Sequence, residues 1–214
     1  MELYSYFRAS SAYRVRIALN YKNLACSIIP VNLRDGEQHG TYRQVNVQKR
    51  VPTLVDTGTK ISQSLAILEY LEEKYPSPSL LPQDINNRAW VRYLAQIIIC
   101  DVHPLNNQSV IKFLQNPLGL DKDKVTTWMH HWMKLGFDTL EELLRQNEDC
   151  KTFCYGNTPT FADLALVPQI YNAKRFKFPL ANYKTLERIN DHCMSLSYFK
   201  IASPENQPDY GLCE

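Results

Sequence analysis

The length, composition and charge of this chain place it among ordinary globular proteins. It has 214 residues, of which 44% are hydrophobic and 21% charged, enough for one large core or two smaller ones. Its formal net charge of +2 gives no concentrated basic face of the kind that a nucleic-acid backbone requires. We therefore expect a two-domain protein without a nucleic-acid partner.

The apolar segments and the cysteines narrow the setting further. No apolar stretch approaches the roughly 20 residues that span a bilayer, and the chain opens with a strand-like pattern instead of a basic leader. We therefore expect a cytoplasmic protein with no membrane partner. The cysteines are Cys26, Cys100, Cys150, Cys154, Cys193 and Cys213. They include no C-x-x-C pair, so we predict neither a dithiol redox centre nor a metal site.

The first 80 residues alternate between short strands and helices. In chain order, the patterns predict a strand over 2–6, a helix over 11–21, a strand over 27–33, a short helix over 42–47, strands over 53–56 and 60–62, and a helix over 64–74. Thr57 and Gly58 supply a two-residue turn between the last two strands. This β-α-β-α-β-β-α order predicts an α/β, thioredoxin-like domain at residues 1–80.

A proline-rich stretch at 76–82 separates these elements from a second, helical region. Prolines break the periodicity there, and no convincing strand follows. The helical patterns run over 88–114 with an interruption at Pro104, over 122–146, and onward from Thr160. We therefore expect an all-α domain at residues 86–214, with residues 204–214 as a loose tail.

Two patterns in the helical region carry structural predictions. Thr160 and Asp163 have the spacing of a capping box, in which each side chain satisfies a backbone N–H of the other residue. The residues of the helix over 122–146 that we expect to face inward are Trp128, Trp132, Leu135, Leu140 and Leu144. We assign the capping box a structural role and not a catalytic one.

The pair Val51 and Pro52, followed by Gln63 and Ser64, indicates binding of a small peptide. A proline before a short apolar strand can keep a cis peptide bond, which exposes the backbone N–H and C=O of Val51 to an extended peptide. Ser64 opens a predicted helix, whose free N–H groups attract a carboxylate. Taken singly, these features indicate a buried turn and an ordinary helix cap. In this order they predict a site for the cysteine-containing tripeptide glutathione.

The reactive group is expected at the first junction between strand and helix. Residues 6–16 contain no cysteine, so the nucleophile would be the glutathione thiolate. Ser10 and Ser11 are candidate donors to that thiolate, whose pKa the helix N-terminus lowers, although they could instead only cap the helix. Arg8, at the same junction, and Arg175, at the basic end of a predicted helix, could each hold a carboxylate or lie solvated at the surface.

Three further residues near these positions carry charge or can titrate. His103 stands beside the break at Pro104, where it could donate near a cleft or be a satisfied interior histidine. Arg14 and Arg16 follow helical spacing, and we assign them structural roles, because one side chain must point across the domain boundary.

Six segments spread over nearly the whole chain closely resemble the zeta class of glutathione transferases. They are YSYFRASSAYRVRIAL, RVPTL, ISQSLAILEYLEEKYP, LLPQD, PTFADLALVPQIYNAKRFK and QPDYG. Members of this class isomerise maleylacetoacetate, in aromatic amino-acid breakdown, or maleylpyruvate from cis to trans, with glutathione that is not consumed. The resemblance implies the glutathione transferase fold, glutathione as cofactor, a small unsaturated dicarboxylic substrate and a homodimer.

The resemblance also implies site residues by position. The glutathione contacts it implies are at Ser10, Ser11, His39, Val51, Pro52, Gln63, Ser64, His103, Asn107 and Ser109. The substrate contacts it implies are at Arg8, His103 and Arg175. In this class the Phe-Arg pair is followed by Ser-Ser-Cys, whereas this chain has Ala9, Ser10 and Ser11. Both serines are therefore catalytic candidates, and which one serves the thiolate stays open.

Three functions remain open on the sequence. In an isomerase, the thiolate adds to the cis double bond, which becomes single and rotates before elimination. In a transferase or dehalogenase acting on α-halo acids, glutathione would be consumed, and in a binding protein catalysis would be lost. We expect an isomerase acting on maleylacetoacetate, with maleylpyruvate as the alternative substrate.

Overall fold

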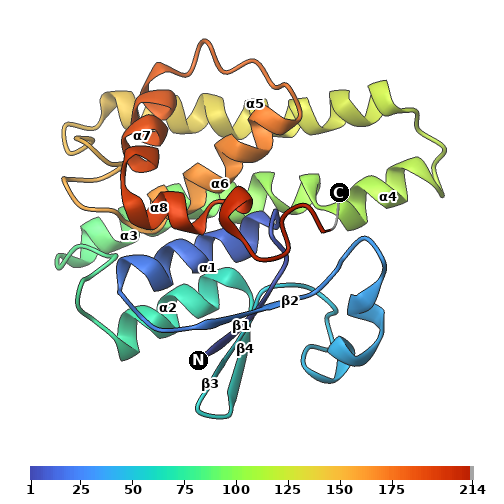
Figure 1. Cartoon of the computed structure of the whole chain (residues 1–214). Helices are drawn as coiled ribbons and strands as arrows, with labels where there is room; N and C mark the ends of the chain where they lie inside the picture. Colours follow the sequence, from blue (N-terminus) through green and yellow to red (C-terminus); the bar gives the residue numbers. More distant parts are fainter. Residues whose placement is uncertain (213–214) are drawn as a thin grey trace. The chain divides into compact units, whose positions relative to one another are not determined.

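The computed structural model describes residues 1–212, which divide into two compact units (Figure 1). Unit 1 contains residues 1–80 and the chain from Met194 onward, and unit 2 contains residues 81–193. The sequence analysis assigns residues 86–214 to one helical domain, whereas the contacts group the residues after 193 with the thioredoxin-like part. Cys213 and the last position of the predicted tail lie outside the described residues.

Unit 1 is built on a four-stranded mixed sheet of order β2-β1-β3-β4. The strands are β1 (Glu2–Ser5), β2 (Ser27–Pro30), β3 (Thr53–Asp56) and β4 (Thr59–Ser62). In the centre, Leu3 of β1 lies opposite Ile28 of parallel β2 and Leu54 of antiparallel β3. The pairing of β1 with β2 stops at Ser5 and Pro30, so β2 is shorter than predicted because its partner strand ends.

Helices α1 (Ser10–Tyr21) and α2 (Ser64–Lys74) pack against each other, and α1 also contacts α8 (Ser197–Ala202). The predicted bounds of α2 are confirmed, and α1 starts one residue earlier than predicted. Between β2 and β3 the chain forms two short 3-10 turns, Glu37–His39 and Thr41–Gln44, in place of the predicted helix over 42–47.

The structural role predicted for the two helical arginines is confirmed within unit 1. Arg14 and Arg16 are 1% and 2% exposed, on a helix buried almost all round. Arg16 donates to the carbonyls of Phe7, at 2.7 Å, and Ala202, at 2.9 Å. Because guanidinium groups make strong charge-assisted bonds, Arg16 joins the start of α1 to the end of α8.

The regular elements of unit 2 are all helical. Its elements are α3 (Ile85–Gln96), a π-helical segment (Ile97–Val102), a 3-10 turn (Pro104–Asn106), α4 (Gln108–Gln115), α5 (Lys122–Gln146), α6 (Phe161–Arg175) and α7 (Lys184–Ser195), whose last two residues belong to unit 1. The predicted break at Pro104 is confirmed, and the preceding helix widens before it. No helix among residues 1–212 is long and apolar enough to cross a membrane.

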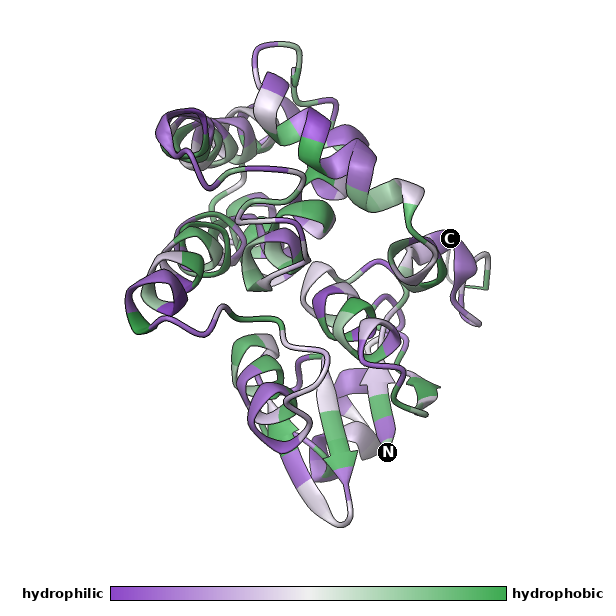
Figure 2. Ribbon diagram, turned by 90° about the vertical axis from the view of Figure 1, so that its left-hand side faces the viewer, coloured by the Kyte–Doolittle hydropathy of each residue, from purple (hydrophilic) through white to green (hydrophobic). Residues whose placement is uncertain are grey.

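Helix α5 has the predicted bounds, and of the residues predicted to face inward Leu140 and Leu144 are buried and Trp128 and Trp132 half-buried. The large apolar side chains it buries are Val125, Met129, Met133, Phe137, Leu140 and Leu144. This stripe, with steps of three and four residues, is the face that a helix presents to a core. Leu135 is 48% exposed, so its predicted inward position is wrong. Figure 2 shows hydrophobic and hydrophilic residues alternating in this way along the helices.

The close approach of α5 to the π-helical segment depends on one glycine. A Cβ atom at Gly136 would collide with Cγ2 of Val102. The absence of a side chain at Gly136 therefore lets α5 lie against this segment. The widened turn leads directly to His103.

Candidate functional site

A tight turn leads from β1 into α1. The N–H of Ala9 donates to the carbonyl of Tyr6 at 3.0 Å, which places Phe7 and Arg8 at the centre of the turn. Ala9 occupies the N-cap position of α1, and its methyl group cannot accept a hydrogen bond from the helix. The first backbone N–H groups of α1 therefore have no side-chain cap, and the positive end of the helix dipole is open at Ser10.

The Val51-Pro52 bond lies beside this helix start. It is cis, as the sequence predicts. The hydroxyl of Ser11 donates to the carbonyl of Val51 at 3.0 Å, so the two segments are in direct contact. No residue among 1–212 accepts a hydrogen bond from the N–H of Val51. This N–H is a backbone donor that an extended peptide can use.

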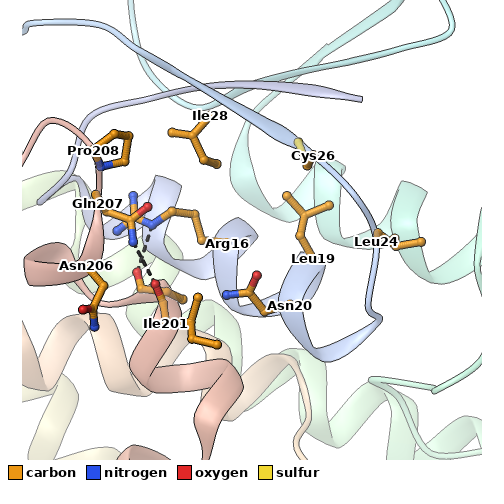
Figure 3. A pocket seen from close by; sticks show the side chains of 11 residues that line it. Arg16, Leu19, Asn20, Leu24, Cys26, Ile28, Ile201, Asn206, Gln207 and Pro208 are labelled. Atoms are coloured by element: carbon orange, nitrogen blue, oxygen red, sulfur yellow. Dashed lines mark hydrogen bonds between the residues drawn. The ribbon is translucent and has the colours of Figure 1, made fainter.

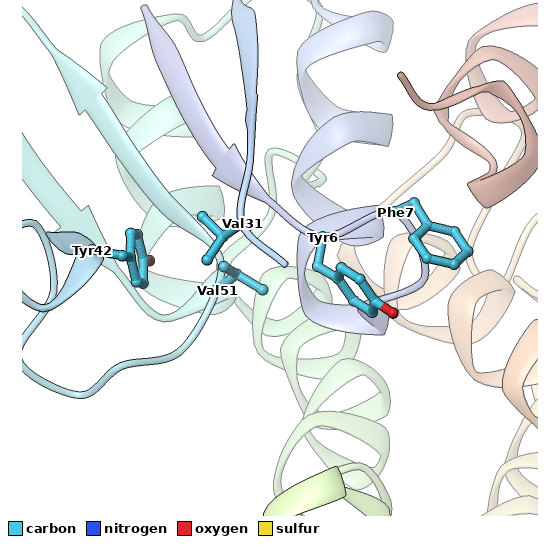
Figure 4. Packing of buried hydrophobic residues seen from close by; sticks show 5 residues of the cluster. All are labelled: Tyr6, Phe7, Val31, Tyr42 and Val51. Atoms are coloured by element: carbon cyan, nitrogen blue, oxygen red, sulfur yellow. The ribbon is translucent and has the colours of Figure 1, made fainter. Parts of the chain in front are cut away.

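Apolar side chains hold Val51 in place (Figure 4). Val51 is 8% exposed and belongs to a cluster with Tyr6, Phe7, Val31 and Tyr42. The hydroxyl of Tyr42 donates to the carbonyl of residue 50 at 2.7 Å, which fixes the backbone just before Val51. The free N–H of Val51 therefore sits on a packed support.

The start of α2 has no side-chain cap either. Gln63 occupies its N-cap position with φ +73°, a left-handed conformation that costs a residue other than glycine about 1–3 kcal/mol. Its side chain is exposed and donates to Oε1 of Gln48 at 2.9 Å. Ser64, the first helical residue, is buried, and its hydroxyl accepts from Arg14 at 3.2 Å. A strained backbone such as that of Gln63 is typical of functional positions.

These hydrogen bonds bring most of the predicted glutathione residues of unit 1 together. Ser11 contacts Val51, and Arg14, one helical turn further along α1, contacts Ser64. His39 is the exception. It lies exposed at the end of a 3-10 turn, and no hydrogen bond joins it to the other predicted residues of the described chain.

Arg8 carries a positive charge that no residue of the described chain neutralises. Its guanidinium lies 5.4 Å from the ring centre of Phe7 and 5.9 Å from that of Tyr6. It forms no ion pair with a carboxylate of residues 1–212. Aromatic rings hold a guanidinium without using its N–H groups, so these donors can receive an external carboxylate.

The predicted residues of unit 2 come from two segments of the chain, residues 103–109 and the end of α6. Asn107 caps α4: its Oδ1 accepts from the N–H and from the hydroxyl of Ser109, each at 3.0 Å. His103 is half-buried at the end of the π-helical segment. Arg175, the last residue of α6, is exposed and stacks on the ring of Phe176 at 4.3 Å. No hydrogen bond joins Arg175 to Asn107 or Ser109.

The capping box at the start of α6 is present, as predicted. The buried carboxylate of Asp163 accepts from the N–H groups of Thr160, at 2.8 Å, and Cys154, at 2.7 Å. Burial raises the pKa of Asp163, partly offset by these hydrogen bonds. Both oxygens of the Asp163 carboxylate are therefore used within the protein, so the capping box is structural.

Four of the cysteines have raised thiol pKa values. Burial raises the pKa of Cys26 to about 11 and also raises those of Cys150, Cys154 and Cys193. Such thiols are poor thiolate nucleophiles at neutral pH. No group of three or more potential metal ligands gathers among residues 1–212.

A separate pocket of about 180 Å³ lies beside α1 (Figure 3). Its walls come from α1, the start of β2 and the chain after α8, including Leu19, Ile28 and Gln207. None of the predicted site residues lines it. Two contacts near the site have no prediction from the sequence: that of Gln48 with Gln63, and that of Asp209 with the N–H of Phe7. Asp209 lies in the QPDYG segment, to which the resemblance assigned no role.

Comparisons with known proteins agree with this arrangement. Residues 3–79 match the family model of the glutathione S-transferase N-terminal domain. A maleylacetoacetate isomerase of Pseudomonas aeruginosa is 44% identical over 98% of both chains. The holo structure of a maleyl pyruvate isomerase, described as a bacterial zeta-class glutathione transferase, superposes with a TM-score of 0.96 at 38% identity, covering 98% of this chain and 99% of the other.

One further solved structure is a maleylacetoacetate isomerase of Anaeromyxobacter dehalogenans with dicarboxyethyl glutathione and citrate bound in its active site. It has a TM-score of 0.86 and 39% identity, covering 97% of this chain and 92% of the other. Identities of this size extend over nearly the full length of each protein. The chain therefore belongs to the zeta class of glutathione transferases, the family of the maleylacetoacetate and maleylpyruvate isomerases.

Proposed function

We propose that this protein is a glutathione-dependent cis–trans isomerase of a small unsaturated dicarboxylic acid, of the maleylacetoacetate type. One observation carries the proposal: in unit 1, two uncapped helix starts are joined to a backbone segment with an unused N–H group. Ser11 of α1 is bonded to Val51, whose N–H is unused, and Ser64 of α2 is bonded to Arg14 of α1. A thiol-bearing peptide with a terminal carboxylate matches these donors.

The residues of unit 1 fit glutathione by type. The N–H of Val51, next to Pro52, would pair with the peptide backbone, and the start of α2 at Gln63 and Ser64 would hold the γ-glutamyl carboxylate. His39 would contact the tripeptide from the exposed 3-10 turn. From unit 2 we propose further contacts at the residues that the resemblance implies, His103, Asn107 and Ser109.

The two serines have different hydrogen bonds, which suggests different roles. The hydroxyl hydrogen of Ser11 is used by the carbonyl of Val51, whereas the hydroxyl of Ser10 makes no hydrogen bond within residues 1–212. We therefore assign Ser10 as the donor that stabilises the thiolate, with the open start of α1 lowering the thiol pKa. Ser11 holds the backbone of Val51 at a fixed position relative to Ser10.

Glutathione, when bound, supplies a thiolate that adds to the cis double bond and leaves after the bond has rotated. The protein's part is to hold the substrate and its charge. Arg8, with no carboxylate partner of its own, would bind one substrate carboxylate, and Arg175 and His103 would bind the other end. A relative with dicarboxyethyl glutathione in its active site supports a substrate of this chemistry.

The test is isomerisation of maleylacetone, a stand-in for maleylacetoacetate, and of maleylpyruvate, followed by ultraviolet absorbance with and without glutathione. We expect turnover that needs glutathione and leaves its concentration unchanged. Ser10→Ala should reduce kcat about 100-fold and Ser11→Ala less, because only Ser10 contacts the thiolate. Turnover that consumes glutathione would replace the isomerase with a transferase acting on α-halo acids.

The substrate itself is the finer part of the proposal. A high structural similarity to a maleyl pyruvate isomerase makes maleylpyruvate the second candidate, and the ratio of kcat/KM for the two compounds decides between them. We also propose a homodimer in the cytoplasm, which the family resemblance supports. Sedimentation of the purified protein tests the dimer.

A further inference from the structure

The chain after α8 is ordered up to residue 212, so the predicted loose tail is wrong for these residues. It forms a 3-10 turn, Pro204–Asn206, followed by a hydrogen bond from the N–H of Tyr210 to the carbonyl of Gln207 at 3.0 Å. Gln207 is 8% exposed and donates to two carbonyls at the end of α8, one of them that of Ile201 at 3.0 Å (Figure 3). The segment is therefore anchored to α8.

Asp209 joins this segment to the turn before α1. Its Oδ2 accepts from the N–H of Phe7 at 2.8 Å, across 202 positions of sequence, and the carboxylate is 3% exposed. The ring of Tyr210 packs edge-on against Phe7 at 5.8 Å. On the other side, the carbonyl of Phe7 accepts from Arg16 at 2.7 Å. Charged side chains thus hold both backbone groups of Phe7.

The held residue is the one that precedes Arg8. Phe7 and Arg8 are the central residues of the turn closed by the bond from Ala9 to Tyr6. The N–H of the first central residue in such a turn points out of it and needs a partner elsewhere. Asp209 is that partner. Because the guanidinium of Arg8 lies over the rings of Phe7 and Tyr6, the position of Phe7 decides where Arg8 lies.

Stability alone does not account for a carboxylate at this position. Oδ1 of Asp209 is buried and accepts no hydrogen bond from residues 1–212. A buried carboxylate oxygen without a donor costs free energy, whereas an amide would accept from Phe7 without burying a charge. What the turn before Arg8 requires is an acceptor for the N–H of Phe7, and the charge of Asp209 makes this bond about twice as strong as the one that an amide oxygen would accept.

We propose that Asp209 is a positioning residue of the isomerase: through the N–H of Phe7 it fixes the turn that presents Arg8 to a substrate carboxylate. The proposal rests on the proposed function and on the role given there to Arg8. Asp209 itself touches no substrate. Asp209→Ala should raise KM for the dicarboxylic substrate about tenfold, since Arg8 loses its fixed support, with kcat and glutathione affinity changed less than threefold.

The experiment compares Asp209→Ala, Asp209→Asn and the matched control Glu205→Ala, an exposed carboxylate of the same segment. We expect Asp209→Asn to restore KM to within about threefold of wild type, because its amide oxygen still accepts from Phe7, and Glu205→Ala to equal wild type. In an Arg8→Ala background, Asp209→Ala should add less than twofold. A full tenfold effect in that background, or no rescue by Asp209→Asn, overturns the proposal.

Two readouts separate this inference from the proposed function. Hydrogen exchange at the Phe7 amide should be slow in wild type and Asp209→Asn and fast in Asp209→Ala, whatever reaction is catalysed. Maleate binding in the presence of glutathione, followed by calorimetry, should weaken about tenfold in Asp209→Ala. If wild type shows no isomerisation but both readouts respond, the function fails and the positioning role stands. If neither responds, the positioning role is wrong. Asp209→Ser replaces Asp209→Ala if that variant does not fold.

Discussion

Helices of the two units begin in different ways. In unit 2, the starts of α3, α4, α5 and α6 are capped by side chains, those of Asp84, Asn107, Asp121 and the Thr160–Asp163 box. In unit 1, α1 and α2 begin after Ala9 and Gln63, neither of which makes a side-chain cap.

The difference shows what each helix start does. A capped start satisfies its own N–H groups and stabilises the fold by about 1 kcal/mol. An uncapped start leaves donors and a positive dipole end for a ligand, and the protein is less stable until that ligand binds. Variants that remove a cap in unit 2 or add one in unit 1 test this contrast.

Asp163→Ala should have the largest effect on the free energy of unfolding. It removes the acceptor of two buried backbone N–H groups, and we expect a loss of about 3 kcal/mol in urea denaturation. Asp121→Ala, which removes an exposed cap, is the control and should lose much less. Equal losses would mean that burial of the cap is not what matters. The folded fraction of Asp163→Ala should bind glutathione as wild type does.

Ala9→Asp should exchange function for stability at the start of α1. Ala9 has the extended backbone of an N-cap residue, φ −68° and ψ 114°, so an aspartate there can accept from the first N–H groups of the helix. We expect a gain of about 1 kcal/mol in unfolding free energy and a roughly tenfold weaker binding of glutathione, whose thiolate the new charge repels. Ala9→Ser is the neutral control. Unchanged glutathione affinity in Ala9→Asp would show that the thiol does not lie near this helix start.

Gln63→Gly should separate backbone strain from side-chain binding at the start of α2. Glycine adopts φ +73° without strain, so we expect stability to rise by up to about 1 kcal/mol despite the loss of the exposed bond to Gln48. Glutathione should bind a few-fold more weakly because the amide is gone. Gln63→Asn, which tolerates the same φ and keeps an amide, should lie between. Thermal unfolding and calorimetry measure both quantities, and a less stable Gln63→Gly would contradict the strain argument.

The pH dependence of the capped start gives the smallest expected effect. Burial raises the pKa of Asp163, so the native state keeps its proton at higher pH than the unfolded chain does. Its contribution to stability is therefore greatest below the ordinary aspartate pKa of about 4 and falls as the pH rises through the raised value. The difference in unfolding free energy between wild type and Asp163→Asn should shrink as the pH rises above about 4. A difference that grows with pH would mean that folding lowers the pKa of Asp163 instead of raising it.

Sequence patterns within a few residues predicted those parts of the fold that depend on interactions between near neighbours in the chain. The bounds of α2 and α5 and the capping box of α6 follow from periodicity and from residues within one helical turn. The cis bond before Pro52 follows from the residue type and its place before a strand. The inward position of Leu135 was wrong because the buried stripe steps from Met133 to Phe137, which puts Leu135 on the opposite side of the helix.

The remaining features of the fold and the site depend on contacts between residues far apart in the sequence, which local patterns do not predict. Ser10 and Ser11 are neighbouring residues of the same type, and only the hydrogen bond from Ser11 to Val51 distinguishes their roles. The positive φ of Gln63 has no signal in a glutamine, which rarely adopts it. The chain after α8 is polar and contains prolines, so its sequence predicts a loose tail. Its structure depends on a partner near the other end of the chain, the N–H of Phe7.

The bond between Phe7 and Asp209 has a consequence for synthesis of the protein. A ribosome adds about 5–20 residues per second, so Asp209 is made roughly 10–40 s after Phe7. Throughout that time the nascent chain holds its first strand and helix without the carboxylate that holds the turn between them. The sheet can form early, but the substrate-binding arginine gains its support only when Asp209 leaves the exit tunnel, so this region is completed after translation of nearly everything else described here.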